Sequence, residues 1–160
     1  MDIGAVRGGR GAGLRERWVG QPLWARWALA AYVIGFLEGT CAHLLDLARG
    51  GIHAYASYPL VSQVLFIGLV FLDPLAAVLV GLLRKEGIWL AGAVMVLDVC
   101  ANWFGNWSWV RNDPARLLPP VGLLPLTAFG LFVIVFLIPM LRTVAASRQP
   151  GTDGLVSRRS

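Results

Sequence analysis

The chain has 160 residues, the length of one ordinary domain, but 57% of them are hydrophobic and only 14% are charged. A soluble domain usually carries about 25% charged residues, so this chain has too few to cover a surface that faces water. The net charge of +5 does not indicate a nucleic-acid partner, because the basic residues stand at the ends of apolar stretches and not on one aromatic-rich face. The composition therefore excludes a soluble globular domain and predicts a membrane protein.

The two ends of the chain differ from its middle. Residues 1–20 are rich in Gly and Arg, and we expect them to form a disordered basic tail. The apolar stretch that follows is longer than the core of a signal peptide and has no small-residue cleavage site at its end, so we expect an uncleaved span. Residues 144–160 are again polar, and we expect a second disordered tail there.

Four apolar blocks occupy the domain between these tails, residues 21–143. Each has the roughly 20 residues that a helix needs to cross the hydrocarbon core of a bilayer. Helices also satisfy their own backbone hydrogen bonds, as lipid requires. The sequence therefore predicts an all-α polytopic membrane protein, a bundle of four transmembrane helices. The expected spans cover residues 24–47, 60–83, 87–109 and 121–141.

The basic residues predict how this bundle is oriented. If both termini are cytoplasmic, eleven of the 14 Lys and Arg residues lie on the cytoplasmic side, and only Arg49, Arg111 and Arg116 lie outside. Such an excess follows the positive-inside rule. We therefore expect an integral protein of the plasma membrane with its N- and C-termini in the cytoplasm.

Three carboxyl groups fall near the middle of the first three spans, those of Glu38, Asp73 and Asp98. A rise of about 1.5 Å per residue places them at one depth in the membrane. A carboxyl at mid-bilayer costs about 2.5–3.5 kcal/mol on insertion scales and usually faces the bundle interior or water. A single acid could simply hydrogen-bond a neighbouring helix, but three at one depth favour a functional site. No Lys or Arg lies at that depth, so we expect at least one of the three to hold a proton at neutral pH.

Further polar residues lie on the outer side of these acids. Asn102 and Asn106 follow Asp98 at intervals of four and form one stripe with it, while Asp46 shares a helix face with Glu38. We therefore expect a polar pocket between the first three spans. Its expected catalytic residues are Glu38, Asp73, Asp98 and His43, and its expected ligand-binding residues are Asp46, Asn102, Asn106, Trp103, Gln63 and Tyr32.

Smaller motifs add detail to this expectation. The pair Gly35 and Gly39 forms a small-residue packing motif that would let another helix approach Glu38. The two cysteines, Cys41 and Cys100, form no metal or redox motif and are expected to pack as thiols. We expect no metal site and no cofactor, because the histidine spacing does not suit a ligand pair and no nucleotide-binding motif is present.

Four short segments carry a likeness to a known family: Gly68–Pro74 (GLVFLDP), Leu83–Gly87 (LRKEG), His43–Leu47 (HLLDL) and Ile138–Arg142 (IPMLR). They resemble segments of the EXPERA-type membrane proteins, a group that includes the emopamil-binding sterol isomerases and the sigma-2 receptor. The resemblance implies four spans around a cavity, entered from the membrane, that holds a lipophilic and often cationic molecule. In the isomerase branch, acidic and His side chains move protons to and from a sterol double bond. The stripe that begins at Asp98 is not part of this resemblance.

Two functions remain open on this evidence. The first is a cofactor-independent membrane enzyme that isomerises or cyclises a terpenoid- or sterol-like substrate through a carbocation, with Asp98 or Asp73 as the acid and Glu38 or His43 as the base. Trp103 and Tyr32 would stabilise the cation through their π faces. The alternative is a non-catalytic binder or carrier of a lipophilic cation, or a small proton-linked transporter that would need a homodimer. In both cases the partners are a lipophilic small molecule and membrane lipid.

Overall fold

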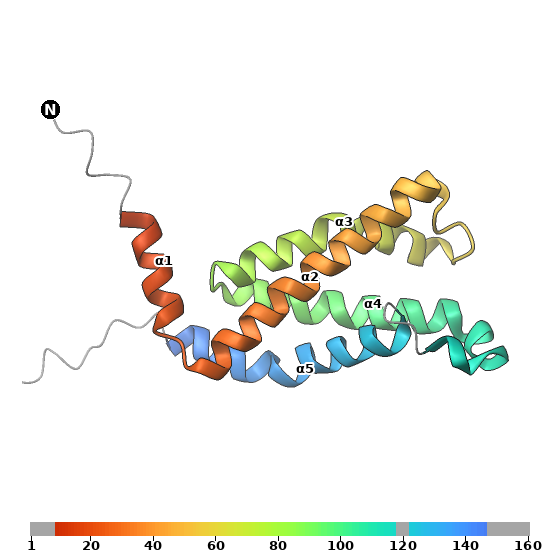
Figure 1. Ribbon diagram of the computed structural model, residues 1–160. Coiled ribbons are helices and arrows are strands. Elements are labelled where there is room, and N and C mark those ends of the chain that lie inside the picture. The colour runs from red at the N-terminus through yellow and green to blue at the C-terminus, as the bar shows by residue number, and fades with distance from the viewer. Residues whose placement is uncertain (1–8, 118–121, 147–160) are drawn as a thin grey trace, which may run out of the picture.

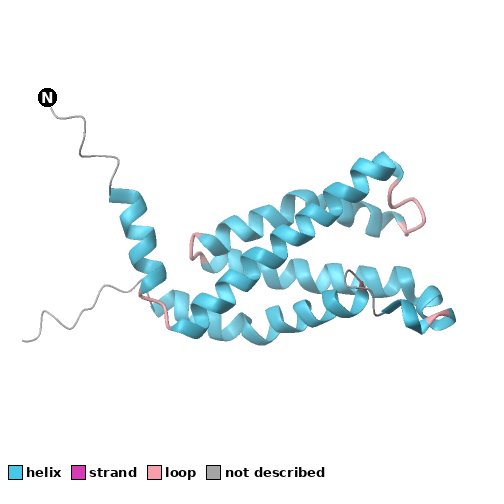
Figure 2. Ribbon diagram, viewed as in Figure 1, coloured by secondary structure: helices cyan, strands magenta, loops and turns pink. Residues whose placement is uncertain are grey.

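The computed structural model describes residues 9–117 and 122–146, which are helical almost throughout (Figure 1; Figure 2). There is no strand in this part of the chain, so the all-α prediction is confirmed. The α-helices are α1 (Gly9–Val19), α2 (Leu23–Gly50), α3 (Leu60–Gly81), α4 (Lys85–Asn112) and α5 (Leu123–Ala146), and the short 3-10 helices are η1 (Gly51–His53) and η2 (Pro114–Leu117).

Four of the helices, α2 to α5, are long and apolar enough to cross a membrane. The prediction of four spans is therefore confirmed, and it indicates an integral membrane protein. Helix α5 continues to Ala146, into the segment predicted to be a disordered tail, because Val144 is still fully buried. The rest of both predicted tails, residues 1–8 and 147–160, and the predicted start of the last span at residue 121 lie outside the described residues.

The four long helices pack in chain order, α2 along α3, α3 along α4, and α4 along α5. Helices α2 and α5 meet along the first half of α2 and the middle of α5. We call the end of the bundle at which α2 begins and α5 finishes the closed end. There the rings of Trp24 and Phe136 lie 6.2 Å apart, and Tyr32 Oη donates a 2.6 Å hydrogen bond to the carbonyl of Val133.

Farther along α2, the rings of Phe36 and Phe129 lie 5.8 Å apart. Towards Gly50 of α2 and Leu123 of α5 the helices diverge, and Figure 1 shows α2 rising away from α5. We call this the open end of the bundle.

The buried face of α2 explains why the helix packs tightly at the closed end. Its members recur at helical spacing, and all except Leu29 are small or aromatic, whereas large apolar side chains such as Trp27 and Ile34 are exposed, as expected for surfaces that face lipid. Cys41 and Cys100 are free and exposed, so these thiols do not pack in the interior as expected. The buried residues of α2 are Ala25, Ala28, Leu29, Tyr32 and Phe36.

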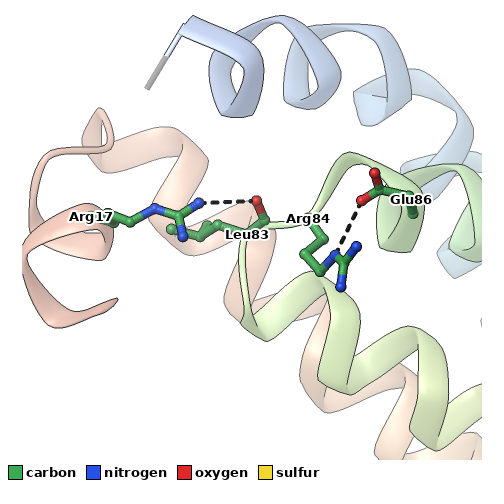
Figure 3. A network of polar contacts seen from close by, with 4 residues as sticks. All are labelled: Arg17, Leu83, Arg84 and Glu86. Carbon is green, nitrogen blue, oxygen red and sulfur yellow. Dashed lines mark hydrogen bonds and ion pairs between the residues drawn. The ribbon is translucent and has the colours of Figure 1, made fainter. Parts of the chain in front are cut away.

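The N-terminal segment differs from the expectation of a disordered tail, because residues 9–19 form helix α1. Long-range hydrogen bonds hold this helix against the turn between α3 and α4. Trp18 Nε1 donates to the carbonyl of Gly81 at 2.8 Å, and the Arg17 guanidinium donates to the carbonyl of Leu83 at 3.3 Å (Figure 3). Gly81 is the last residue of α3, and Leu83 lies in the turn that follows. Carbonyl groups at the C-terminal end of a helix have no backbone N–H partner within the helix, so they can accept hydrogen bonds from other segments.

Candidate functional site

A cavity of about 680 Å³ lies at the open end, where α2 and α5 diverge. Its lining comes from α2, α4 and α5 and from Gly122, directly before α5. The expected pocket lay between the first three spans, but none of the described lining residues belongs to α3. The reason is geometric: α3 packs closely against both α2 and α4, and the gap forms on the side where α5 parts from α2.

One wall of the cavity is polar and carries six of the predicted site residues. Residues three, four or eight positions apart lie on the same side of a helix, and α2 and α4 each present three of them to the same space. The polar lining residues are Glu38, His43 and Asp46 from α2, and Asp98, Asn102 and Asn106 from α4.

The opposite wall comes from α5 and is apolar. Sequence reasoning missed it, because α5 has no ionisable residue before Arg142 and so gave no polar signal. Phe129 marks the base of this wall, where the ring also packs against Gly35. The apolar residues from α5 are Leu123, Pro125, Leu126 and Phe129.

Asp98 is the most enclosed acid of the cavity lining, with 8% of its surface exposed. Its Oδ1 accepts a 2.9 Å hydrogen bond from Asn102 Nδ2. The stripe continues outward, because Asn106 Nδ2 donates to Tyr58 Oη at 3.1 Å. A buried carboxyl that keeps a defined hydrogen-bond donor has a fixed orientation, and this is the first requirement of an acid or base in catalysis.

Asp73 does not line the cavity, although the sequence placed it among the catalytic acids. It is 5% exposed and lies between α3 and α2, where a Cβ at Gly39 would come within 2.7 Å of Asp73 Oδ2. Asp73 therefore lies beside Gly39, which lines the cavity, without lining the cavity itself.

His43 and Asp46 are linked by a residue that the sequence analysis missed. Tyr55 lies in the loop after η1, 6% exposed, and its Oη is 2.9 Å from His43 Nδ1 and 3.1 Å from Asp46 Oδ2. Helical spacing carried no signal for Tyr55, because this residue lies in a loop and not on a helix face. Burial and the adjacent Asp46 carboxylate raise the pKa of the Tyr55 hydroxyl above its ordinary value.

Three other predicted ligand-binding residues hold the bundle together and do not line the cavity. Tyr32 is buried at the closed end, bonded to α5. Trp103 Nε1 donates to Thr127 Oγ1 at 2.8 Å and so joins α4 to α5. Gln63 Nε2 donates to the carbonyl of Tyr58 at 2.8 Å, which fixes the loop that precedes α3.

The cavity lining is acidic. Glu38, Asp46 and Asp98 contribute carboxyl groups, and no Lys or Arg is found among the described lining residues. In the same part of the chain, no three His, Cys, Asp or Glu side chains gather as a protein metal site requires. The arrangement can attract a cation, accept and donate protons, and enclose a hydrocarbon group against α5.

No protein-family model matches the chain, and no curated protein or solved structure shows significant similarity to it.

Proposed function

We propose that the protein is a membrane enzyme that binds a lipophilic terpenoid- or sterol-like molecule in this cavity and isomerises or cyclises it by proton transfer. The observation that carries the proposal is the pairing of an acidic wall with an apolar wall in one cavity. About 680 Å³ lies within the range of roughly 300–1,000 Å³ found for small-molecule sites. The resemblance to the EXPERA-type proteins points to the same class of ligand.

The route into the cavity follows from the divergence of α2 and α5. A lipophilic molecule is concentrated in the bilayer, and the gap between these helices faces lipid if the four helices span the membrane. The apolar part of the ligand would then pack on Leu126 and Phe129, and its polar part would reach the acids of α2 and α4.

The proton chemistry needs an acid, a base and a means of stabilising positive charge. Asp98 is enclosed and oriented by Asn102, so it is our candidate for the acid that protonates an alkene or epoxide. Glu38 or His43 would take a proton from a neighbouring carbon of the cation, and passage of that proton back to Asp98, directly or through water, would restore the starting state. An isomerisation of this kind consumes no cofactor. Trp109 and Phe129 line the cavity and would stabilise a carbocation through their π faces, the role first expected of Trp103 and Tyr32.

A second function is favoured by the charge of the lining. Three carboxyl groups with no Lys or Arg among the described lining residues would also suit a non-catalytic binder of a lipophilic amine, or a proton-linked transporter. In that case the acids hold a cation and no bond of the ligand changes.

The test compares the wild-type protein with variants that lack one of the two proposed acid–base groups. We expect Asp98→Asn and Glu38→Gln each to lower turnover at least a hundredfold, since general acid–base groups contribute about 10²–10⁴-fold. Lipid that copurifies with the wild-type protein, identified by mass spectrometry, supplies the substrate, and incubation in deuterated water reports proton exchange on carbon. Glu16→Gln in α1, an exposed acid outside the cavity, is the matched control.

Incorporation of deuterium into a recovered terpenoid by the wild-type protein and the control, but not by the two variants, would support the enzyme. Full activity of both variants would overturn the acid–base assignment. An unchanged amine-bearing lipid that the two variants no longer retain would favour the binder.

The orientation proposed for the membrane also has structural support. At the closed end, Arg17 reaches the turn that carries Arg84 and Lys85, and Arg26 and Arg142 lie in the neighbouring turns of α2 and α5. We propose that this end is cytoplasmic and that the cavity lies in the outer half of the plasma membrane.

A further inference from the structure

We infer that Tyr55 is a positioning residue that holds His43 in the tautomer with its proton on Nδ1, so that Nε2 is a proton acceptor at the cavity. The inference deepens the proposed function. The use of Nε2 by a ligand rests on that function. The tautomer itself can be measured without any ligand.

The geometry begins with two residues one turn apart on α2. His43 and Asp46 both line the cavity, and Tyr55 approaches them from the loop after η1. Tyr55 belongs instead to a shallower groove that it shares with Asp46, Arg49 and Tyr58. The Tyr55 hydroxyl therefore bridges the two side chains from behind the cavity wall.

Counting protons assigns the tautomer. A tyrosine hydroxyl has one proton, and here it is donated to Asp46 Oδ2 at 3.1 Å. The 2.9 Å contact between Tyr55 Oη and His43 Nδ1 then needs its proton from the imidazole. A neutral imidazole carries one proton, so Nε2 is left with a lone pair.

Neighbouring rings keep this arrangement in place. The Phe66 ring stacks on His43 with centroids 6.0 Å apart and an interplanar angle of 20°, and it also lies 5.0 Å from Tyr55. The raised pKa of Tyr55 keeps its hydroxyl protonated, so it remains a donor to Asp46. Within the described residues, His43 Nε2 has no hydrogen-bond partner, which leaves it available to a ligand hydroxyl or ammonium group.

Nitrogen-15 NMR of the full chain in lipid nanodiscs, with labelled histidine, tests the inference. The variant His53→Gln removes the other histidine, which is exposed and outside the cavity, and a pH of about 8 keeps a histidine of ordinary pKa neutral. We expect the one-bond coupling to a proton at Nδ1 and the unprotonated nitrogen signal at Nε2.

Two variants separate positioning from packing. In Tyr55→Phe the ring remains but the acceptor for Nδ1–H is gone, so we expect the proton to move to Nε2. In Asp46→Ala the Tyr55 hydroxyl loses its acceptor and turns its proton to Nδ1, so we again expect Nε2–H although Tyr55 is intact. A proton on Nε2 in the parent protein, or on Nδ1 in either variant, would overturn the inference.

Failure of the proposed function would look different. If turnover survives in the Asp98 and Glu38 variants, the acid–base chemistry is wrong, but the tautomer measurement is unaffected. Thermal unfolding of each variant in detergent shows whether the bundle is intact, and His43→Gln provides the blank for the NMR signals.

Discussion

The ring of Phe129 lies directly on Gly35, at the base of the cavity. A Cβ on residue 35 would overlap this ring, and an aromatic ring cannot move aside as the end of a flexible chain can. The small-residue motif of α2 thus serves two neighbours: Gly35 admits α5, and Gly39 admits Asp73 of α3.

We predict that Gly35→Ala destabilises the protein by about 1–3 kcal/mol, because the added methyl overpacks the contact with Phe129. Thermal unfolding in detergent, followed by near-ultraviolet circular dichroism, measures the change. The control is Gly68→Ala in α3, where a Cβ would meet no atom within 4 Å and the better helix propensity of Ala should preserve or raise stability. Equal behaviour of the two variants would contradict this account.

Helical spacing predicts which residues of one helix share a face, but not which neighbour that face meets. This is why Asp98, Asn102 and Asn106 were predicted together and are found together. Asp73 lies next to Gly39 and does not line the cavity. Whether these residues act on a ligand stays a prediction. Tyr55 could not be ranked from sequence, because its role depends on the path of a loop.

At the scale of elements, α1 illustrates the limit of composition as a guide. The segment is polar and rich in Gly and Arg, and nothing in its own sequence compensates for the entropy of ordering it. Its partners are carbonyl groups about 60 residues away at the end of α3, which only the folded bundle presents. The long spans were predictable for the opposite reason, because lipid imposes their length and polarity locally.

We predict that Trp18→Phe releases α1, since the variant keeps an aromatic ring but loses the hydrogen bond to Gly81. A typical hydrogen bond contributes about 0.5–1.5 kcal/mol, so the detached fraction should rise roughly two- to tenfold. Limited trypsin digestion detects this as faster cleavage after Arg15 and Arg17. The control is Trp27→Phe, which changes a Trp of α2 that is 71% exposed. Cleavage at the same rate in both variants would show that the hydrogen bond from Trp18 to Gly81 does not hold α1 in place.

At the scale of the whole molecule, the even number of spans brings the start of α2 and the end of α5 to one side. The basic residues predict which side that is, because they gather at the closed end. The fold class and the spans could be predicted, but the location of the cavity could not. It depends on where α5 leaves α2, and both helices have apolar faces that fit many arrangements.

Cysteine labelling tests the orientation. In a background with Cys41→Ser and Cys100→Ser, Ser57→Cys places a thiol in the exposed loop at the open end, and Lys85→Cys places one at the closed end. A maleimide that cannot cross the membrane should label Ser57→Cys in intact cells and Lys85→Cys only after permeabilisation. The reverse pattern would place the cavity in the cytoplasmic half of the membrane.

The divergence of α2 from α5 has a consequence for how affinity is measured. If the cavity opens towards the acyl chains, a ligand reaches it by displacing lipid tails from Leu126 and Phe129, not by leaving water. Its occupancy is then governed by the mole fraction of ligand among the lipids. Adding carrier lipid at constant total ligand would weaken apparent binding by dilution, and lipids with bulkier tails would compete less well for the space above Phe129.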